Sequence, residues 1–171
     1  MPIINAFKIS VVLLAITFAN TCHAGEAIIS WGDMATFTDI DPTNTSKKNF
    51  NKSLQRSFDD ELTRLAKKLP EGYSLSMHIR NIDLAGKVNT VASANGKNVR
   101  VLAGNFHPMM IFDFKVTDSG GAIVLEQSNY KIQDLNYFYS ALSVVAASTN
   151  FYYEFNMLEK WFKADVLTKI N

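Results

Sequence analysis

Two histidines and two aspartates come nearest, in this sequence, to a catalytic or metal-binding set. His78 lies in a segment where polar and apolar residues alternate, and His107 precedes Pro108 at the start of a second such segment. If these segments are neighbouring strands, the two imidazoles could approach each other, with Asp83 or Asp113 completing a metal site or a hydrolytic site. Surface or hydrogen-bonded histidines are the more common outcome. The sequence therefore predicts no catalytic residue, no cofactor and no metal, and it keeps His78 and His107 as candidates.

A second group of charged residues has both a binding and a structural interpretation. Arg100 could hold a carboxylate or phosphate ligand in the fork of its guanidinium group, with Asp83 in the same polar pocket. Alternatively, Asp134 caps a helix, Glu154 lies in a first helical turn, and Arg100 pairs with one of them. The structural interpretation is favoured because acidic residues are common at helix starts for electrostatic reasons alone.

Aromatic residues crowd the C-terminal part of the chain between positions 137 and 162. One helical face cannot bury all of them, and Tyr152 and Trp161 fall towards the edge of the apolar stripe or beyond it. An exposed aromatic patch often contacts a protein, a peptide or a glycan. Alternatively, residues 138–147 form an apolar helix that covers the patch. The candidate binding residues are Asp83, Arg100, His107, Asp134, Tyr137, Tyr153, Glu154 and Trp161.

The first 24 residues have the pattern of a cleaved signal peptide. Residues 9–19 form an apolar run that is too short to span a bilayer as a helix. Small residues stand at Cys22 and Ala24, the two positions that a signal peptidase inspects. We expect cleavage after Ala24, which leaves Gly25 as the N-terminus and places the protein in the periplasm or outside the cell. An uncut membrane anchor is the alternative, and lipidation at Cys22 is disfavoured because the residues before it do not match the lipoprotein pattern.

Composition argues against several classes of protein. The chain has 17 basic and 16 acidic residues, and the predicted cleavage removes one lysine and the only cysteine. A neutral mature protein is a poor candidate for binding nucleic acid or an anionic lipid surface. The mature part contains no second apolar stretch of membrane-spanning length. It also lacks a G-x-S-x-G elbow, an H-E-x-x-H motif and a phosphate-binding glycine loop.

Hydrophobic periodicity predicts the elements that must position these residues. Apolar residues recur every three or four positions from Ser46 to Leu69, which indicates a helix that Pro70 ends. Residues 73–80 alternate as a strand, and a change of phase at Asn81 indicates a bulge or the end of that strand.

The remaining segments complete a single domain over residues 25–171. We expect short strands at 27–31 and 98–102, a polar loop at 85–97, a hairpin of 108–117 with 122–130, and helices at 135–147 and 151–170. The order predicts an α+β fold. Its sheet would be mostly antiparallel, with about four to five strands and two to three helices packed on one side.

Five short fragments recur in the order found in one known family. They are Phe37-Thr38-Asp39-Ile40, Ile82-Asp83-Leu84-Ala85-Gly86, Val99-Arg100-Val101, Asp134-Leu135-Asn136-Tyr137, and Tyr153-Glu154 with Met157-Leu158 and Trp161-Phe162. The chain thereby resembles the proteobacterial family called domain of unknown function 3016. The resemblance implies a small protein with a signal peptide, and it supplies no established activity, cofactor or catalytic residue that could be carried over to this chain. The apolar stretch 138–150 departs from the polar stretch that the family would lead us to expect.

The leading hypothesis is an exported, non-enzymatic binding protein of the cell envelope that uses an aromatic C-terminal surface. Its partner would be another envelope protein or a second copy of itself, with no nucleic acid and no membrane span in the mature form. The alternatives are a small metal-dependent or His/Asp hydrolase and a carrier of a small apolar ligand.

Overall fold

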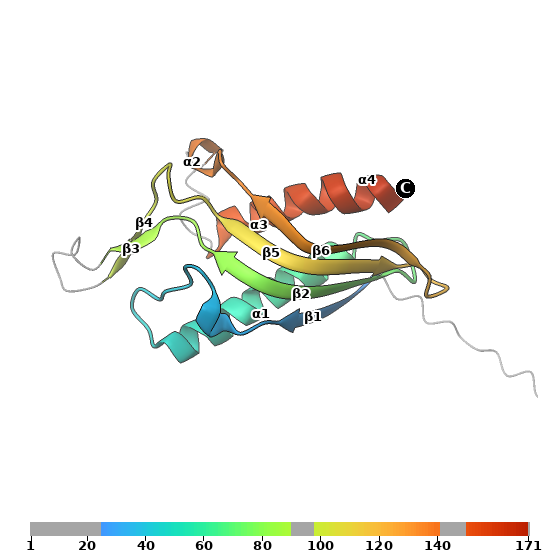
Figure 1. Cartoon of the computed structure of the whole chain (residues 1–171), viewed down its shortest axis with the longest axis horizontal. Helices are drawn as coiled ribbons and strands as arrows, with labels where there is room; N and C mark the ends of the chain where they lie inside the picture. The colour runs from blue at the N-terminus through green and yellow to red at the C-terminus, as the bar shows by residue number, and fades with distance from the viewer. Residues whose placement is uncertain (1–24, 90–97, 141–149, 171) are drawn as a thin grey trace, which may run out of the picture.

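The computed structural model describes residues 25–89, 98–140 and 150–170, which form a single α+β domain (Figure 1). The predicted signal peptide lies outside these residues. The main sheet has the order β1-β2-β5-β6, and β3 and β4 form a separate two-stranded sheet. The strands are β1 (Glu26–Trp31), β2 (Ser74–Asp83), β3 (Lys87–Asn89), β4 (Val99–Val101), β5 (Met109–Thr117) and β6 (Ile123–Gln133). The helical elements are η1 (Met34–Thr36), α1 (Lys47–Ala66), α2 (Tyr137–Ser140), α3 (Tyr152–Trp161), η2 (Phe162–Leu167) and α4 (Thr168–Ile170).

Strands β1 and β2 run parallel and are joined by α1, the kind of crossover that a parallel pair requires. Ser46 caps α1, because its hydroxyl accepts a hydrogen bond from the Asn49 amide at 3.3 Å. Trp31 of β1 donates to Asp59 of α1 at 3.0 Å and holds the strand against the helix. The predicted helix is confirmed, and its apolar stripe packs into the core with only Phe50 partly exposed.

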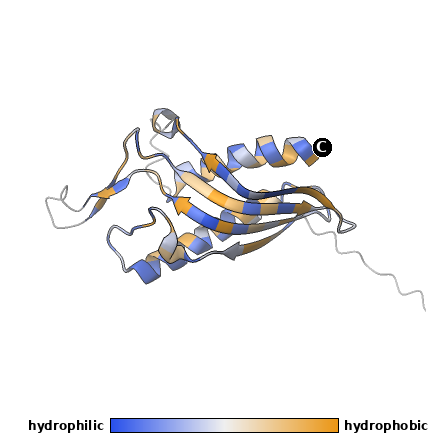
Figure 2. Cartoon of the chain, in the orientation of Figure 1, coloured by the Kyte–Doolittle hydropathy of each residue, from blue (hydrophilic) through white to orange (hydrophobic). Residues whose placement is uncertain are grey.

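The other two neighbouring pairs in the sheet are antiparallel, β2 with β5 and β5 with β6. Burial alternates along β2 and β5, as the alternation of hydropathy in Figure 2 reflects. The register shifts between Ile79 and Asn81, so the predicted bulge is confirmed. Helices α1 and α3 lie on the same face of the sheet (Figure 1), and polar side chains such as Ser76 and Arg80 occupy the opposite, open face.

The C-terminal helix runs from Tyr152 to Ile170 through α3, the π-helical segment η2 and α4, close to the predicted range. The helix predicted at 135–147 is represented by the single turn α2, and residues 141–147 lie outside the described part of the chain. Among the described residues, no helix combines the length and the apolar character that a membrane crossing requires.

Strands β3 and β4 form a short antiparallel hairpin at one end of the main sheet. The sequence predicted a polar loop over 85–97, and that prediction is wrong for residues 87–89; residues 90–97 are not among those described. Gly86 begins the hairpin with a φ of +77°, and a Cβ there would lie 2.5 Å from the Val101 carbonyl oxygen. The position therefore requires glycine, because a larger residue would be strained and would collide with β4.

Candidate functional site

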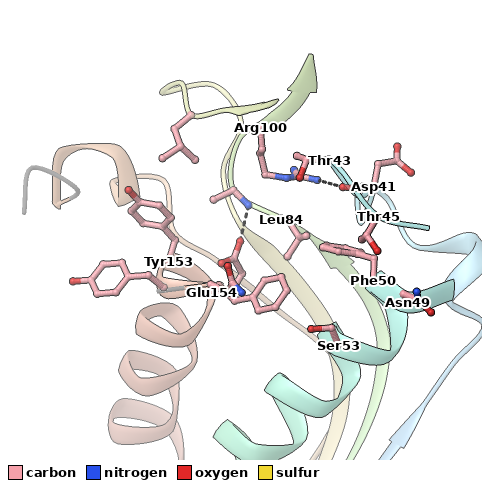
Figure 3. Close-up of a pocket in the computed structure, with 15 residues that line it drawn as sticks. Asp41, Thr43, Thr45, Asn49, Phe50, Ser53, Leu84, Arg100, Tyr153 and Glu154 are labelled. Carbon is pink, nitrogen blue, oxygen red and sulfur yellow. Dashed lines mark hydrogen bonds between the residues drawn. The ribbon is translucent and has the colours of Figure 1, made fainter. Parts of the chain in front are cut away.

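A pocket of about 570 Å³ lies at the end of the domain where the β3–β4 hairpin, the loop before α1 and the first turns of α1 and α3 meet (Figure 3). This volume is within the range of small-molecule sites. Its lining includes Thr43, Thr45, Asn49, Phe50, Ser53, Leu84, Arg100, Phe151 and Glu154.

Arg100 sits above the pocket and connects three separate segments. Its two terminal nitrogens bind the carboxylate of Asp39 at 3.0 and 3.3 Å. The same nitrogens donate to the carbonyl oxygens of Gly86 and Asp41, both at 3.0 Å. All four terminal N–H groups therefore have protein acceptors, and the arginine pairs with neither of the two acids named from the sequence.

Glu154 is the one charged residue that is fully buried in the described part of the chain, with 3% of its surface exposed. Its carboxyl group accepts a hydrogen bond from the Ala85 amide at 2.7 Å, which joins the start of α3 to the end of β2 (Figure 3). Burial raises the pKa of Glu154 above its ordinary value, although the hydrogen bonds from backbone amides oppose the rise. Burial thus makes ionisation of Glu154 less favourable than that of an exposed glutamate.

Phe151 precedes α3 in a left-handed conformation, with φ of 60° and ψ of 27°. Such a conformation in a non-glycine residue is strained by about 1 kcal/mol or more. The ring offsets this strain by packing against Phe58 at 5.5 Å and Phe50 at 6.1 Å between centroids. The aromatic contacts therefore fix the angle at which α3 enters the wall of the pocket.

Asp83 lies beside the pocket rather than in it. A parallel bridge joins its backbone to Asp39, so the two carboxylates are neighbours. Burial raises the pKa of Asp83, and the charge of Asp39 raises it further, while the charge of Arg100 lowers it. Arg100 thus compensates two acids at once, which is a structural role of the kind that the sequence favoured.

Tyr137, His107 and Tyr153 form a contiguous group on the far side of the hairpin. The Tyr137 hydroxyl donates to the Ala103 carbonyl oxygen at 2.6 Å. Its ring makes edge contacts with Tyr153 at 5.1 Å and with His107 at 6.0 Å. Of the three, only Tyr153 also lines the pocket.

Asp134 and Trp161 lie away from the pocket. Asp134 accepts from the Asn136 amide at 3.0 Å and from Lys160 at 2.8 Å, so it acts as a cap and an ion-pair partner.

Trp161 was expected at the edge of an exposed patch, and that expectation is wrong. Its ring is 3% exposed and packs edge-on against Phe112 and Phe114 at 4.8 and 5.1 Å. The reason is that α3 contacts both the sheet and α1, so its buried face is wider than one stripe.

The two candidate histidines are not brought together. His78 is paired with Asp113 across β2 and β5, on the open face of the sheet. His107 lies six residues before Asp113, a separation of about 20 Å along a strand. In the described ranges, no group of three or more histidine, cysteine, aspartate or glutamate residues is arranged to hold a metal ion.

His78 has one polar contact that suggests chemistry, with the Ser30 hydroxyl 2.9 Å from its Nδ1. Asp113, the acid opposite, is bound by Arg80 at 2.6 to 2.9 Å and by the Asn129 amide at 2.8 Å. These hydrogen bonds lower the pKa of Asp113 to about 2. Its carboxylate is therefore engaged elsewhere and does not orient His78.

The neutral polar residues of the pocket were missed by reasoning from the sequence. They are Thr43, Thr45, Asn49 and Ser53, which lie in the loop before α1 and on its first two turns. Polar residues are expected in such a loop and on the solvent side of a helix, so nothing in their spacing distinguishes them. Phe50 nearby did carry a local signal, because it begins the apolar stripe of the predicted helix.

Residues 25–164 match the model of the family described as Protein of unknown function (DUF3016). The match spans most of the chain, and the chain belongs to this family. No curated protein matches the chain. Of the residues in the resembling fragments, Asp83 and Arg100 share one ion cluster and Glu154 lies in the wall of the adjoining pocket.

Proposed function

We propose that this protein is an exported, non-enzymatic binding protein of the bacterial cell envelope, and that it holds its ligand in the pocket between α1, α3 and the β3–β4 hairpin. The observation that carries the proposal is the pocket itself, about 570 Å³ in volume, with a buried carboxyl group and aromatic residues in its wall. Two of its charged side chains, Arg100 and Glu154, are held by hydrogen bonds within the protein. A general acid or base must reach a proton of its substrate, so side chains held in this way are poor candidates for that role.

Export is supported by the start of the folded domain. Gly25 is buried, and a Cβ at this position would collide with the Ala66 carbonyl group at the end of α1. The Glu26 amide donates to the Tyr73 carbonyl oxygen at 3.1 Å. The family match also begins at residue 25. A family region that begins at this residue suits cleavage after Ala24.

A partner protein or a second copy of the chain could instead dock on exposed aromatic residues. With Trp161 and Tyr137 buried, the exposed large apolar residues near the C-terminus, within the described part of the chain, are Leu135, Phe138 and Tyr139, which are 59%, 42% and 80% exposed. This surface is smaller than the sequence suggested, so the pocket is the better-supported site. Among the described residues, the contact of Ser30 with His78 is what favours the hydrolase alternative.

Native mass spectrometry of the protein purified from its own envelope tests the proposal. We expect a chain that begins at Gly25 and carries a bound molecule. Ser53→Trp should release that molecule by filling the pocket, whereas Lys52→Trp, one residue away and not among the lining residues, should retain it. A full-length chain found in the cytosol would contradict export, and a ligand retained equally by both variants would contradict the site.

A further inference from the structure

We propose that the ligand of this pocket is an uncharged saccharide, a deduction that rests on the proposed binding function and adds the class of ligand. The geometry that supports it is a contrast between charged groups whose hydrogen-bonding capacity is already used and neutral polar groups whose capacity is not. A sugar ring carries many hydroxyl groups that both donate and accept, and it has an apolar face formed by its C–H bonds.

The charged side chains leave little for a charged ligand to bind. The four terminal N–H groups of Arg100 donate to Asp39, Gly86 and Asp41. The Asp41 carboxylate stands at the rim, 3.7 Å from the ammonium group of Lys47. An anion in the pocket would lose its hydration without gaining a free cation, and would lie near two acidic residues. A phosphate or carboxylate ligand, the kind that Arg100 suggested from the sequence, is therefore disfavoured.

The neutral polar side chains are available for a ligand. Thr43, Thr45, Asn49 and Ser53 line the pocket, and within the described ranges their side chains make no hydrogen bond to another protein group. Hydroxyl and amide groups offer donors and acceptors together. They therefore match a ligand whose own groups are hydroxyls, which also donate and accept.

The remaining wall is apolar. Phe50, Phe151 and Leu84 come from α1, the start of α3 and the end of β2, and all three line the pocket. Ring contacts of Phe151 with Phe50 and Phe58 hold the two aromatic members of this wall in position. In Figure 3, Phe50 and Ser53 project from the same helix, so the apolar and hydroxyl-bearing surfaces lie side by side. A saccharide with a polar edge and an apolar face satisfies both surfaces, whereas a purely apolar ligand would leave the hydroxyl groups desolvated and unpaired.

Isothermal calorimetry on the mature chain 25–171 tests the class of ligand with three probes. N-acetylchitotriose represents a neutral saccharide, inorganic phosphate an anion and 1-decanol an apolar molecule. We expect binding of the saccharide alone. The double variant Asn49→Ala/Ser53→Ala should bind it about tenfold more weakly, since each lost neutral hydrogen bond weakens binding about threefold or more. Both positions are exposed and alanine favours helices, so the fold is retained.

Lys52→Ala provides the matched control, because Lys52 lies between the two substituted positions and does not line the pocket. Its affinity for N-acetylchitotriose should equal that of the unmodified protein. Binding of phosphate or 1-decanol instead, or equal binding by the double variant, would overturn the saccharide assignment and leave the binding function standing. Absence of binding by all three probes would also overturn the assignment. The proposed function is judged separately, by whether Ser53→Trp releases the ligand from envelope-purified protein.

Discussion

Two arginine–aspartate pairs hold segments of this domain together, and they differ in their surroundings. Arg80 and Asp113 pair across β2 and β5 on the open face, where the two side chains are 46% and 26% exposed. Arg100 and Asp39 pair beside the pocket, where the corresponding values are 18% and 20%. Both arginines approach their partners with two nitrogens. Only Arg100 also binds two backbone carbonyl oxygens and compensates a second acid, Asp83.

An ion pair holds segments together more strongly where water and salt cannot reach it and take the place of either partner. Water and salt screen the pair on the open face, so either partner can be removed at little cost. Removing Arg100 would leave two neighbouring carboxylates and two carbonyl oxygens without their donor in a partly buried region. We therefore expect the stability of the pocket end to depend on its ion pair more than that of the open face does.

The largest effect is expected for Arg100→Ala. Loss of the guanidinium group should destabilise the domain by about 3 kcal/mol, because it leaves Asp39 and Asp83 uncompensated. Urea denaturation of the mature chain provides the measurement. Arg80→Ala is the matched control on the open face, and its transition should lie close to that of the unmodified protein. Equal losses for the two variants would contradict the distinction drawn between the pairs.

A smaller effect is expected for Glu154→Ala. The buried Ala85 amide would lose its acceptor, which should cost about 2 kcal/mol. Glu154→Gln keeps an acceptor of the same shape, so it should recover most of this loss near neutral pH. Urea denaturation of both variants at pH 7 distinguishes them. A glutamine variant as unstable as the alanine variant would show that the negative charge itself is required.

The pH dependence of stability should also report Glu154. Burial raises the pKa of Glu154 in the folded state above its ordinary value of 4.5. Between the ordinary pKa and the folded pKa, the folded protein therefore binds more protons than the unfolded chain. The contribution of this group is thus greatest at lower pH and declines as the pH rises through the folded pKa. Thermal denaturation between pH 4 and pH 8 should show a decline that Glu154→Gln reduces. An unchanged profile in that variant would contradict this assignment.

The smallest effect is expected for Asp113→Asn. The folded-state pKa of Asp113 is lowered to about 2, so its contribution is present above the ordinary value of 3.8 and is lost as the pH falls towards 2. Exposure of the pair to solvent keeps this contribution small. Denaturation at pH 2, pH 3 and pH 6 should show a slight deficit for the variant at pH 6, a smaller one at pH 3 and almost none at pH 2. A large deficit at pH 6 would mean that the open-face pair is as important as the one beside the pocket.

The elements of this fold could be predicted because their signals are local. The stripe of α1, the alternation of β2 and β5 and the bulge at Asn81 each follow from residues within one segment. The width of the buried face of α3, in contrast, does not follow from residues within one segment. Trp161 is buried because α3 packs against the sheet on one side and α1 on the other, and that arrangement involves segments far apart in the sequence.

The candidate site depended even more on distant contacts. Arg100 and Asp39 are 61 residues apart, and Glu154 and the Ala85 amide are 69 residues apart. Spacing along the chain contains no information on such pairings, so the sequence identified Arg100 and Glu154 but not their partners. The uncommitted hydroxyl groups of the pocket were invisible for a different reason, since exposed serine and threonine are ordinary in any loop.

The central claim is that the ligand binds in the pocket and not on the open face of the sheet. Chemical-shift mapping by NMR tests this claim most directly, because it shows which of the two regions a bound ligand contacts. Titration of the ¹⁵N-labelled mature chain with N-acetylchitotriose should shift the backbone amides of Asn49, Ser53 and Glu154 at the pocket. The backbone amide resonances of His78 and Asp113 on the open face should not shift. Shifts confined to the open face, or no shifts at the pocket, would contradict the account.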